Sequence, residues 1–238
     1  MRTGKAAAAV GLCMGVLLLG GCEMLNQDKR WEPREADAIS ISEEGSITEY
    51  VRDTLDEAYY SAAELEQMIQ SEVSDYNAKN GADSVQVKEF TAEGSDVRLT
   101  MEYAKAEDYA AFNNVEFYYG SMINAQLNGY LFDGSYKRVR DGVVQGAAVS
   151  GSEVLKKMAA EVLIVTAPLE VHLPGSVIFT GTNAEVLSAS DVNATGKTDA
   201  EAENTGLVLP SSAVYTGEEK SFEERAAANR VYIIFEMQ

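Results

Sequence analysis

Apolar and polar residues alternate along three parts of the chain, over 38–53, 85–101 and 136–144. Each part is interrupted by a short polar turn that contains glycine, and the last of these turns is Asp141-Gly142. Period-two alternation on both sides of a glycine turn is typical of a β-hairpin, and Asp-Gly is among the strongest turn signals. The pattern therefore predicts three antiparallel hairpins.

A helical period replaces the alternation between the first two hairpins. Apolar residues recur three or four positions apart, at Ala62, Leu65, Met68, Ile69, Val73 and Tyr76. Ser61 and Glu64 have the spacing of a capping box, and Asn80-Gly81 is a typical helix stop. We predict an amphipathic helix over 62–79, with Met68 and Ile69 buried against a sheet. Weaker patterns predict short helices at 107–113 and 120–127.

The last third of the chain is rich in β-strand patterns. Continuous or alternating apolar runs predict strands at 162–165, 169–173, 177–179 and 231–235. The last of these is too apolar for a free tail and is expected to be a buried closing strand. Residues 188–203 are polar and predict an exposed loop, and 218–228 predict a short helix.

Hairpins that alternate with helices indicate an α+β fold: antiparallel hairpins packed with one long amphipathic helix and short helices, and a β-rich C-terminal third. We expect residues 38–157 to form an α+β domain. Residues 158–238 are then the β-rich part of the same domain or a second small one.

The first 21 residues have the pattern of a secretory signal. A basic start is followed by sixteen uncharged residues, Ala6 to Gly21, and then by Cys22 and the first acid. The stretch is shorter than the roughly 20 residues that span a bilayer, which weighs against an uncleaved membrane anchor. Leu19-Gly20-Gly21-Cys22 resembles the lipobox of bacterial lipoproteins. This resemblance implies cleavage after residue 21, acylation of Cys22 with fatty acids such as palmitate, and attachment to the extracytoplasmic side of a cell membrane.

Residues 22–37 are polar and predict a tether, although the lone Trp31 favours an arm that is partly docked. The chain has a net charge of −19, and removal of residues 1–21, with two cations and no acid, would make it −21. Such a charge repels phosphate backbones and excludes nucleic acid as a partner. The expected partners are the membrane, through the N-terminal acyl chains, and an unknown envelope component or protein.

The body of the chain resembles the LppM-type domain of bacterial lipoproteins. The similar features are strand–Glu44-Gly45-Ser46–strand after the tether, the amphipathic helix that follows, and Val171-His172-Leu173-Pro174-Gly175 before the late strands. They cover about a third of the chain. The resemblance implies a protein that handles lipid or envelope components, and it transfers no site residue.

Few residues are available for chemistry. Cys13 lies in the leader and Cys22 is the expected lipid site, so no cysteine is left for a disulfide, a thiolate or a metal. His172 is the only histidine, and with Glu170 it forms half of a nucleophilic triad without a serine elbow. We expect a surface histidine there, with no catalytic residue, cofactor or metal site in the chain.

The polar stretch from Asp191 to Asp199 imitates the start of an EF-hand calcium loop. Ala202 stands where the bidentate glutamate is needed, so we predict that this stretch binds no calcium tightly.

Nine aromatic residues lie between Tyr103 and Tyr136. They form either a core or an exposed surface that recognises a sugar, a wall fragment or a protein, and their spacing favours the core.

Three functions remain. The first is a lipid-anchored, non-enzymatic binding or interaction module, and the second is a carrier of a lipid or other apolar ligand in a cleft beside helix 62–79. The third is an envelope hydrolase that uses carboxylates.

Overall fold

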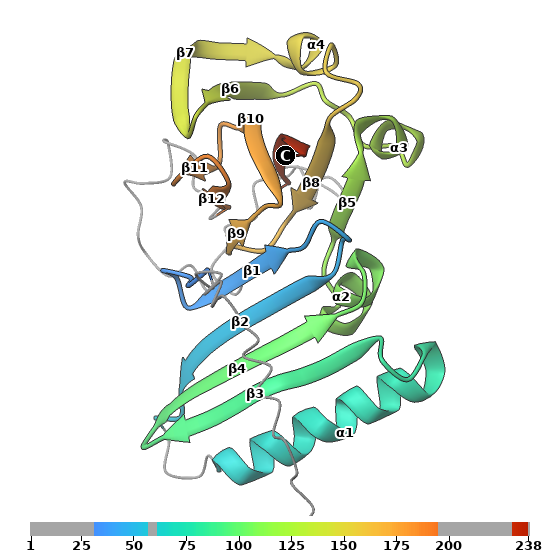
Figure 1. Ribbon diagram of the computed structural model, residues 1–238, viewed down its shortest axis with the longest axis vertical. Coiled ribbons are helices and arrows are strands. Elements are labelled where there is room, and N and C mark those ends of the chain that lie inside the picture. Colours follow the sequence, from blue (N-terminus) through green and yellow to red (C-terminus); the bar gives the residue numbers. More distant parts are fainter. Residues whose placement is uncertain (1–30, 57–60, 195–229, 238) are drawn as a thin grey trace, which may run out of the picture. The chain divides into compact units, whose positions relative to one another are not determined.

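The computed structural model describes residues 31–56, 61–194 and 230–237. They form an α+β fold of two sheets with one long helix and three short ones (Figure 1). The seven-stranded sheet has the order β11 (Glu185–Val186), β12 (Asp191–Asn193), β9 (Glu170–His172), β1 (Asp37–Ile41), β2 (Ile47–Thr54), β4 (Asp96–Tyr103), β3 (Val85–Glu93). The six-stranded sheet has the order β5 (Phe117–Ser121), β8 (Glu161–Val165), β13 (Val231–Met237), β10 (Gly175–Gly181), β6 (Ser135–Arg140), β7 (Val143–Ser150).

The three predicted hairpins are β1–β2, β3–β4 and β6–β7. Among the described strands every pair is antiparallel except β1 with β9, which run parallel. The closing strand β13 lies in the middle of its sheet, between β8 and β10, and its apolar residues are buried as predicted. The C-terminal third therefore contributes strands to both sheets, and residues from 31 onward form one compact unit.

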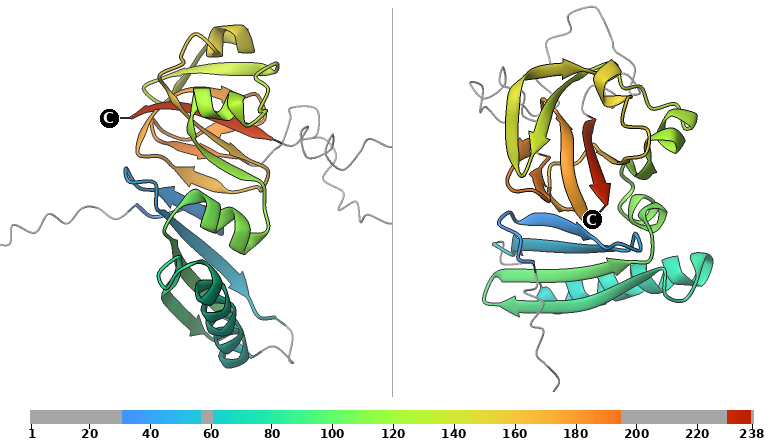
Figure 2. Two further views of the ribbon diagram at one scale, coloured as in Figure 1. Left: turned by 90° about the vertical axis from the view of Figure 1, so that its right-hand side faces the viewer. Right: turned by 45° about the horizontal axis from the view of Figure 1, so that its top comes forward.

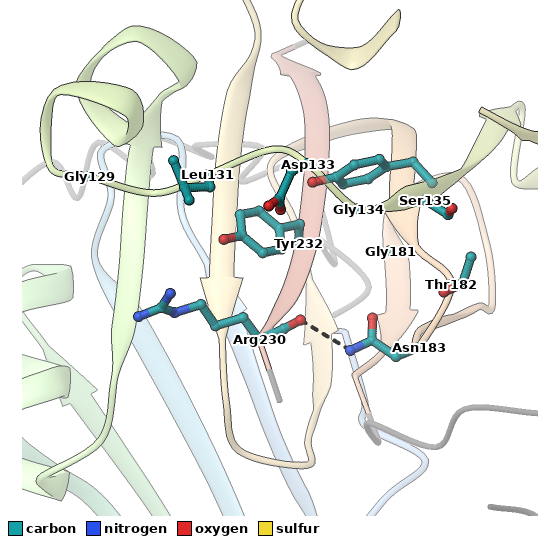
Figure 3. Close-up of a pocket in the computed structure, with 11 residues that line it drawn as sticks. Gly129, Leu131, Asp133, Gly134, Ser135, Gly181, Thr182, Asn183, Arg230 and Tyr232 are labelled. Carbon is teal, nitrogen blue, oxygen red and sulfur yellow. Dashed lines mark hydrogen bonds between the residues drawn. The ribbon is translucent and has the colours of Figure 1, made fainter. Parts of the chain in front are cut away.

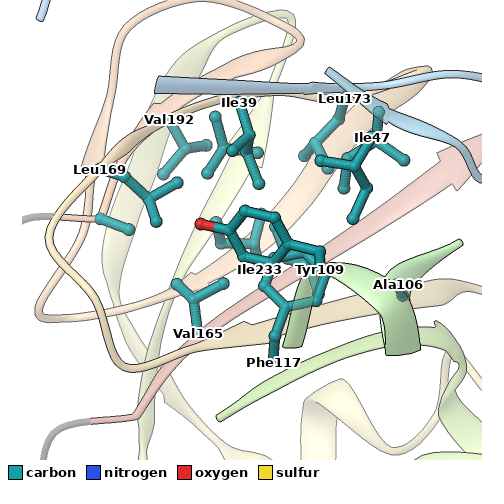
Figure 4. Close-up of a cluster of buried hydrophobic side chains, with 14 of the residues drawn as sticks. Ile39, Ile47, Ala106, Tyr109, Phe117, Val165, Leu169, Leu173, Val192 and Ile233 are labelled. Atoms are coloured by element: carbon teal, nitrogen blue, oxygen red, sulfur yellow. The ribbon is translucent and has the colours of Figure 1, made fainter. Parts of the chain in front are cut away.

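Two apolar clusters lie on opposite faces of the six-stranded sheet. The larger cluster joins this sheet to the seven-stranded one and includes Ile39, Ile47, Tyr109, Leu173 and Ile233 (Figure 4). The smaller cluster packs β8, β10 and β13 against α3 (Met122–Leu127), α4 (Gly151–Val154) and the segment between α3 and β6. Figure 2 shows the two sheets and the helices from two further sides.

The long helix α1 (Ala62–Asn80) begins at Ser61, whose hydroxyl accepts a hydrogen bond from the Glu64 amide at 3.4 Å. The helix packs along β3, at the edge of its sheet, so that only a narrow stripe is covered. Val73 is buried and Ile69 is partly buried, but Met68 is 52% exposed. The prediction that Met68 is buried is therefore wrong.

Two further expectations need correction. The region 120–127 is helical only from Met122, because Phe117–Ser121 pairs with β8 as β5. The expected exposed loop at 188–203 contains β12, and its residues 192–194 are buried by pairing with β9. Residues 195–203 and the predicted helix at 218–228 lie outside the described residues. The predicted helix at 107–113 is confirmed as α2 (Ala106–Asn113).

The end of the predicted tether is docked. Residues 31–36, which we call the arm, lie over the outer face of β1 and β9. The Glu170 carboxylate accepts hydrogen bonds from the amides of Arg34 and Glu35 at 2.7 and 2.9 Å. Trp31 stacks on His172, and Pro33 is buried. Of the predicted tether, residues 31–36 are therefore partly docked, and residues 22–30 lie outside the described residues.

Candidate ligand-binding site

A cavity of about 380 Å³ opens at one end of the six-stranded sheet (Figure 3). Its walls come from three parts of the chain: the segment between α3 and β6, the turn after β10, and the start of β13. We call it the Tyr136 pocket. It is lined by Gly129, Leu131, Asp133, Gly134, Ser135, Tyr136, Gly181, Thr182, Asn183, Arg230 and Tyr232.

Turn geometry shapes two walls of the pocket. Gly129 has φ of +88°, a conformation that glycine adopts without strain, and its amide donates to the Gln126 carbonyl at the end of α3. Across the pocket, a Cβ on Gly181 would stand 2.5 Å from Oδ1 of Asn183. Glycine at this position therefore makes room for the Asn183 amide, whose nitrogen donates to the Arg230 carbonyl at 3.1 Å (Figure 3).

Two tyrosines supply the aromatic part of the pocket. Tyr136 is 2% exposed and Tyr232 is partly buried, and their ring centroids lie 6.2 Å apart in an edge arrangement. Phe132 packs against Tyr232 at 5.2 Å. Burial, with the nearby Tyr232 and Asp133, raises the pKa of the Tyr136 phenol, so the hydroxyl stays a neutral donor.

The hydroxyl of Tyr136 has no hydrogen-bond partner among the described residues. It lies 4.0 Å from the position that a Cβ would take on Gly134, which also lines the pocket. Among the described residues, the buried side-chain polar atoms without a hydrogen-bond partner are Asp108 Oδ2, Thr180 Oγ1 and Asn193 Oδ1, so the Tyr136 hydroxyl is not one of them. It stands at the wall of the pocket, where a phenol can donate to a bound molecule.

The charges of the pocket are nearly balanced. Nε of Arg230 donates to the Glu116 carboxylate at 2.8 Å, and its guanidinium lies 5.3 Å from the centre of the Tyr130 ring. Burial lowers the pKa of Arg230, but the hydrogen bond and charge of Glu116 outweigh this and raise it overall. Asp133 is the only carboxylate among the lining residues, and it is exposed. The site offers donors and acceptors to a polar ligand without a strong preference for charge.

The aromatic residues that the sequence singled out form mainly core, as their spacing predicts. Five of the nine are buried: Tyr103, Tyr109, Phe117, Phe132 and Tyr136. Tyr103 is fully buried and donates to the Glu49 carboxylate at 2.5 Å. Burial raises the pKa of Glu49, although the bond from Tyr103 acts in the opposite direction.

Glu170 and His172 do not work as a pair. Glu170 is 1% exposed because the arm covers it. His172 instead bonds Asp191, with Nδ1 and Oδ1 2.6 Å apart, and its side chain is 34% exposed. Ser188 donates to the other oxygen of Asp191 at 2.6 Å. The serine thus bonds the carboxylate and not the imidazole, unlike the order of a nucleophilic triad.

The mostly buried acids of the seven-stranded sheet are separated. Ile39 pairs with Glu49 on one side and with Val171 on the other, so Glu170 lies on the opposite face of the sheet from Glu49. These two carboxylates cannot converge on one substrate. The described residues contain no group of three or more His, Cys, Asp or Glu side chains that could hold a metal ion. Both oxygens of Asp191 are already bonded, and residues 195–199 of the calcium-like stretch lie outside the described part.

Sequence reasoning missed most of the Tyr136 pocket. Asp133, Asn183 and Arg230 come from three segments of the chain, and the first and last of them are nearly a hundred residues apart. None of the three residues belongs to a motif. The only signal was the aromatic run that contains Tyr136. Cys22 lies outside the described residues, so its lipidation remains a prediction.

No helix in the described part of the chain is both long and apolar enough to cross a membrane. Comparison with family models, with curated proteins and with solved structures finds no match to this chain.

Proposed function

We propose that the chain is a lipid-anchored binding protein on the extracytoplasmic side of a bacterial cell membrane. The anchor rests on the lipobox-like Leu19-Gly20-Gly21-Cys22. We further propose that the Tyr136 pocket takes a neutral, hydroxyl-rich ligand, such as a saccharide unit of the cell envelope. The observation that supports this is Tyr136, whose ring is buried and whose hydroxyl forms no hydrogen bond to another described residue, at a cavity of about 380 Å³.

Saccharides suit the chemistry of this pocket. Ring hydroxyls both donate and accept, and the pocket offers acceptors on Asp133 and Asn183 and donors on Tyr136 and Arg230. A tyrosine face also covers the apolar side of a sugar ring, which favours Tyr232 as a platform. The alternative of an apolar carrier beside α1 has less support, because no residue of α1 lines the Tyr136 pocket.

The test is binding of neutral mono- and disaccharides by the detergent-solubilised full chain, measured by saturation-transfer NMR and titration. Tyr136→Phe removes one hydroxyl and should weaken binding about 3- to 10-fold, the amount that one net hydrogen bond contributes. Tyr50→Phe makes the same change in the other sheet and should leave the affinity unchanged. Equal affinities for both variants, or no saccharide bound, would reject the proposal.

A further inference from the structure

The strand β7 forms one edge of the six-stranded sheet, and the short helix α4 contacts it. Among the described strands it pairs with β6 only, and Val143 to Ala148 are all exposed, Val143 by 59%. All eight residues of β7 are uncharged, in a chain of which 24% is charged. Natural edges are usually kept short or blunted by charges, because free N–H and C=O groups invite another strand.

The other edges differ from β7. The edge strand β3 carries Lys88, Glu89 and Glu93, and β11 has two residues. The third edge, β5, has five residues and contacts α2 and α3, whereas β7 contacts α4. Among the described edges, β7 is the one that combines a run of six exposed residues with lack of charge.

A groove of mixed charge crosses the sheet next to this edge. The second cavity, of about 650 Å³, is lined by three cations, Arg138, Arg140 and Lys157, and by two acids, Asp141 and Glu236. Lys157 is paired with Glu236 at 3.0 Å, and Arg138 is 4.0 Å from Glu153. Arg140 has no ion-pair partner within the described ranges, so it is the cation of this groove that remains unpaired.

The hairpin geometry leaves the backbone N–H and C=O groups of one β7 residue pointing toward the free edge. Asp141 and Gly142 both have positive φ, as in a two-residue type I′ turn. Arg140 then exchanges hydrogen bonds with Val143, while Val144 forms a non-hydrogen-bonded pair with Val139. The N–H and C=O of Val144 therefore point away from β6. Beyond Gln145 the register shifts, so the regular part of the edge is Val143–Gln145.

We propose that this edge binds an extended protein segment with acidic side chains, which adds to the sheet beside β7. Main-chain hydrogen bonds at Val144 would supply affinity, and carboxylates that reach across β7 to Arg138 and Arg140 would supply specificity. A second copy of the chain fits less well: its own β7 has no carboxylate to offer, and two molecules of charge −19 repel each other. The proposal is independent of the Tyr136 pocket.

The probe is a fluorescent eight-residue peptide that alternates valine and glutamate, titrated into the detergent-solubilised full chain. A valine–lysine peptide and a valine–threonine peptide are the controls. We expect the acidic peptide to bind at least tenfold more tightly than either. Val144→Pro should abolish binding, because it removes the outward N–H while proline is tolerated at such edge positions. Circular dichroism and the melting temperature show whether this variant is folded.

A second pair of variants tests what the arginine charges contribute to peptide binding. Arg138→Gln with Arg140→Gln should weaken binding of the acidic peptide about tenfold, and this effect is readable even if Val144→Pro fails to fold. Arg52→Gln with Arg98→Gln removes two exposed arginines from the other sheet and should change nothing. Three results would overturn the proposal. The first is equal binding of all three peptides, and the second is an equal loss of binding in both arginine pairs. The third is a dimer, seen in sedimentation, that competes with the peptide and that the arginine changes leave intact.

Discussion

The indole of Trp31 stacks on the imidazole of His172, with ring centroids 5.1 Å apart and planes 21° from parallel. Tyr50 meets the same indole edge-on at 5.7 Å. This contact fixes the arm to the folded body nine residues after Cys22. If Cys22 carries the lipid, the free tether spans at most about 30 Å, because an extended residue covers about 3.3–3.6 Å.

Glu170→Ala should release the arm. The carboxylate accepts two amide hydrogen bonds from the arm, and a hydrogen bond to a charged group contributes about 1.5–3 kcal/mol. Because Trp31 is the only tryptophan, its fluorescence emission should shift to longer wavelength as water reaches the indole. Glu185→Ala, at an exposed position of β11, is the control. Unchanged emission in Glu170→Ala would contradict the role given to this carboxylate.

Glu49 should make stability fall as pH rises. Burial raises its pKa above the ordinary 4.5, so the folded state holds a proton that the unfolded state has lost. Its contribution to the free energy of unfolding is therefore greatest below pH 4.5 and is lost as pH rises through the folded-state pKa. Urea melts between pH 4 and 7.5 should show this slope reduced in Glu49→Gln. Glu44→Gln, in the exposed turn, should keep the wild-type slope.

Substitutions in the core should lower the free energy of unfolding much more than substitutions on the exposed face of α1. Ile233 is fully buried on β13, in the middle of its sheet, and Ile233→Ala should cost about 2–5 kcal/mol of stability because it opens a cavity. Met68→Ala should cost under about 1 kcal/mol, since Met68 is half exposed. Urea unfolding measures both. A loss at Met68 as large as that at Ile233 would show that α1 packs in another register.

The proposed lipidation would require the thiol of Cys22. Cys22→Ser should leave the protein unprocessed or released, because a serine hydroxyl cannot form the lipid thioether. Detergent phase partitioning and mass measurement of the N-terminus compare the two proteins. The lipoprotein assignment fails if both partition equally into detergent with intact N-termini.

Local patterns predicted the local elements well. The three hairpins and α1 follow from alternation, turn residues and a capping box that act within about twenty residues. The same reasoning could not rank positions on one helical face. Met68 and Val73 are both apolar and both belong to the predicted apolar face of the helix. Which of them is covered depends on where α1 lies along the edge strand β3.

Long-range pairing was beyond the sequence pattern. The parallel contact of β1 with β9 and the position of β13 between β8 and β10 join segments far apart in the chain. For the same reason the sequence pattern placed Asp191 in an exposed loop, whereas it lies on β12 and bonds His172 of the neighbouring strand. The Tyr136 pocket follows this rule, since the pairing of β10 with β6 and with β13 brings its walls together.

The most direct test of the central claim, that the Tyr136 pocket binds a neutral saccharide, is NMR of the protein labelled with ¹⁵N-glycine. Gly129, Gly134 and Gly181 line the pocket, whereas Gly45 and Gly94 lie in hairpin turns of the other sheet. On titration with the tightest-binding saccharide, the amide signals of the three pocket glycines should shift and saturate together while those of the two turn glycines stay fixed. Saturable shifts at Gly45 or Gly94 with none at the pocket glycines would contradict the account.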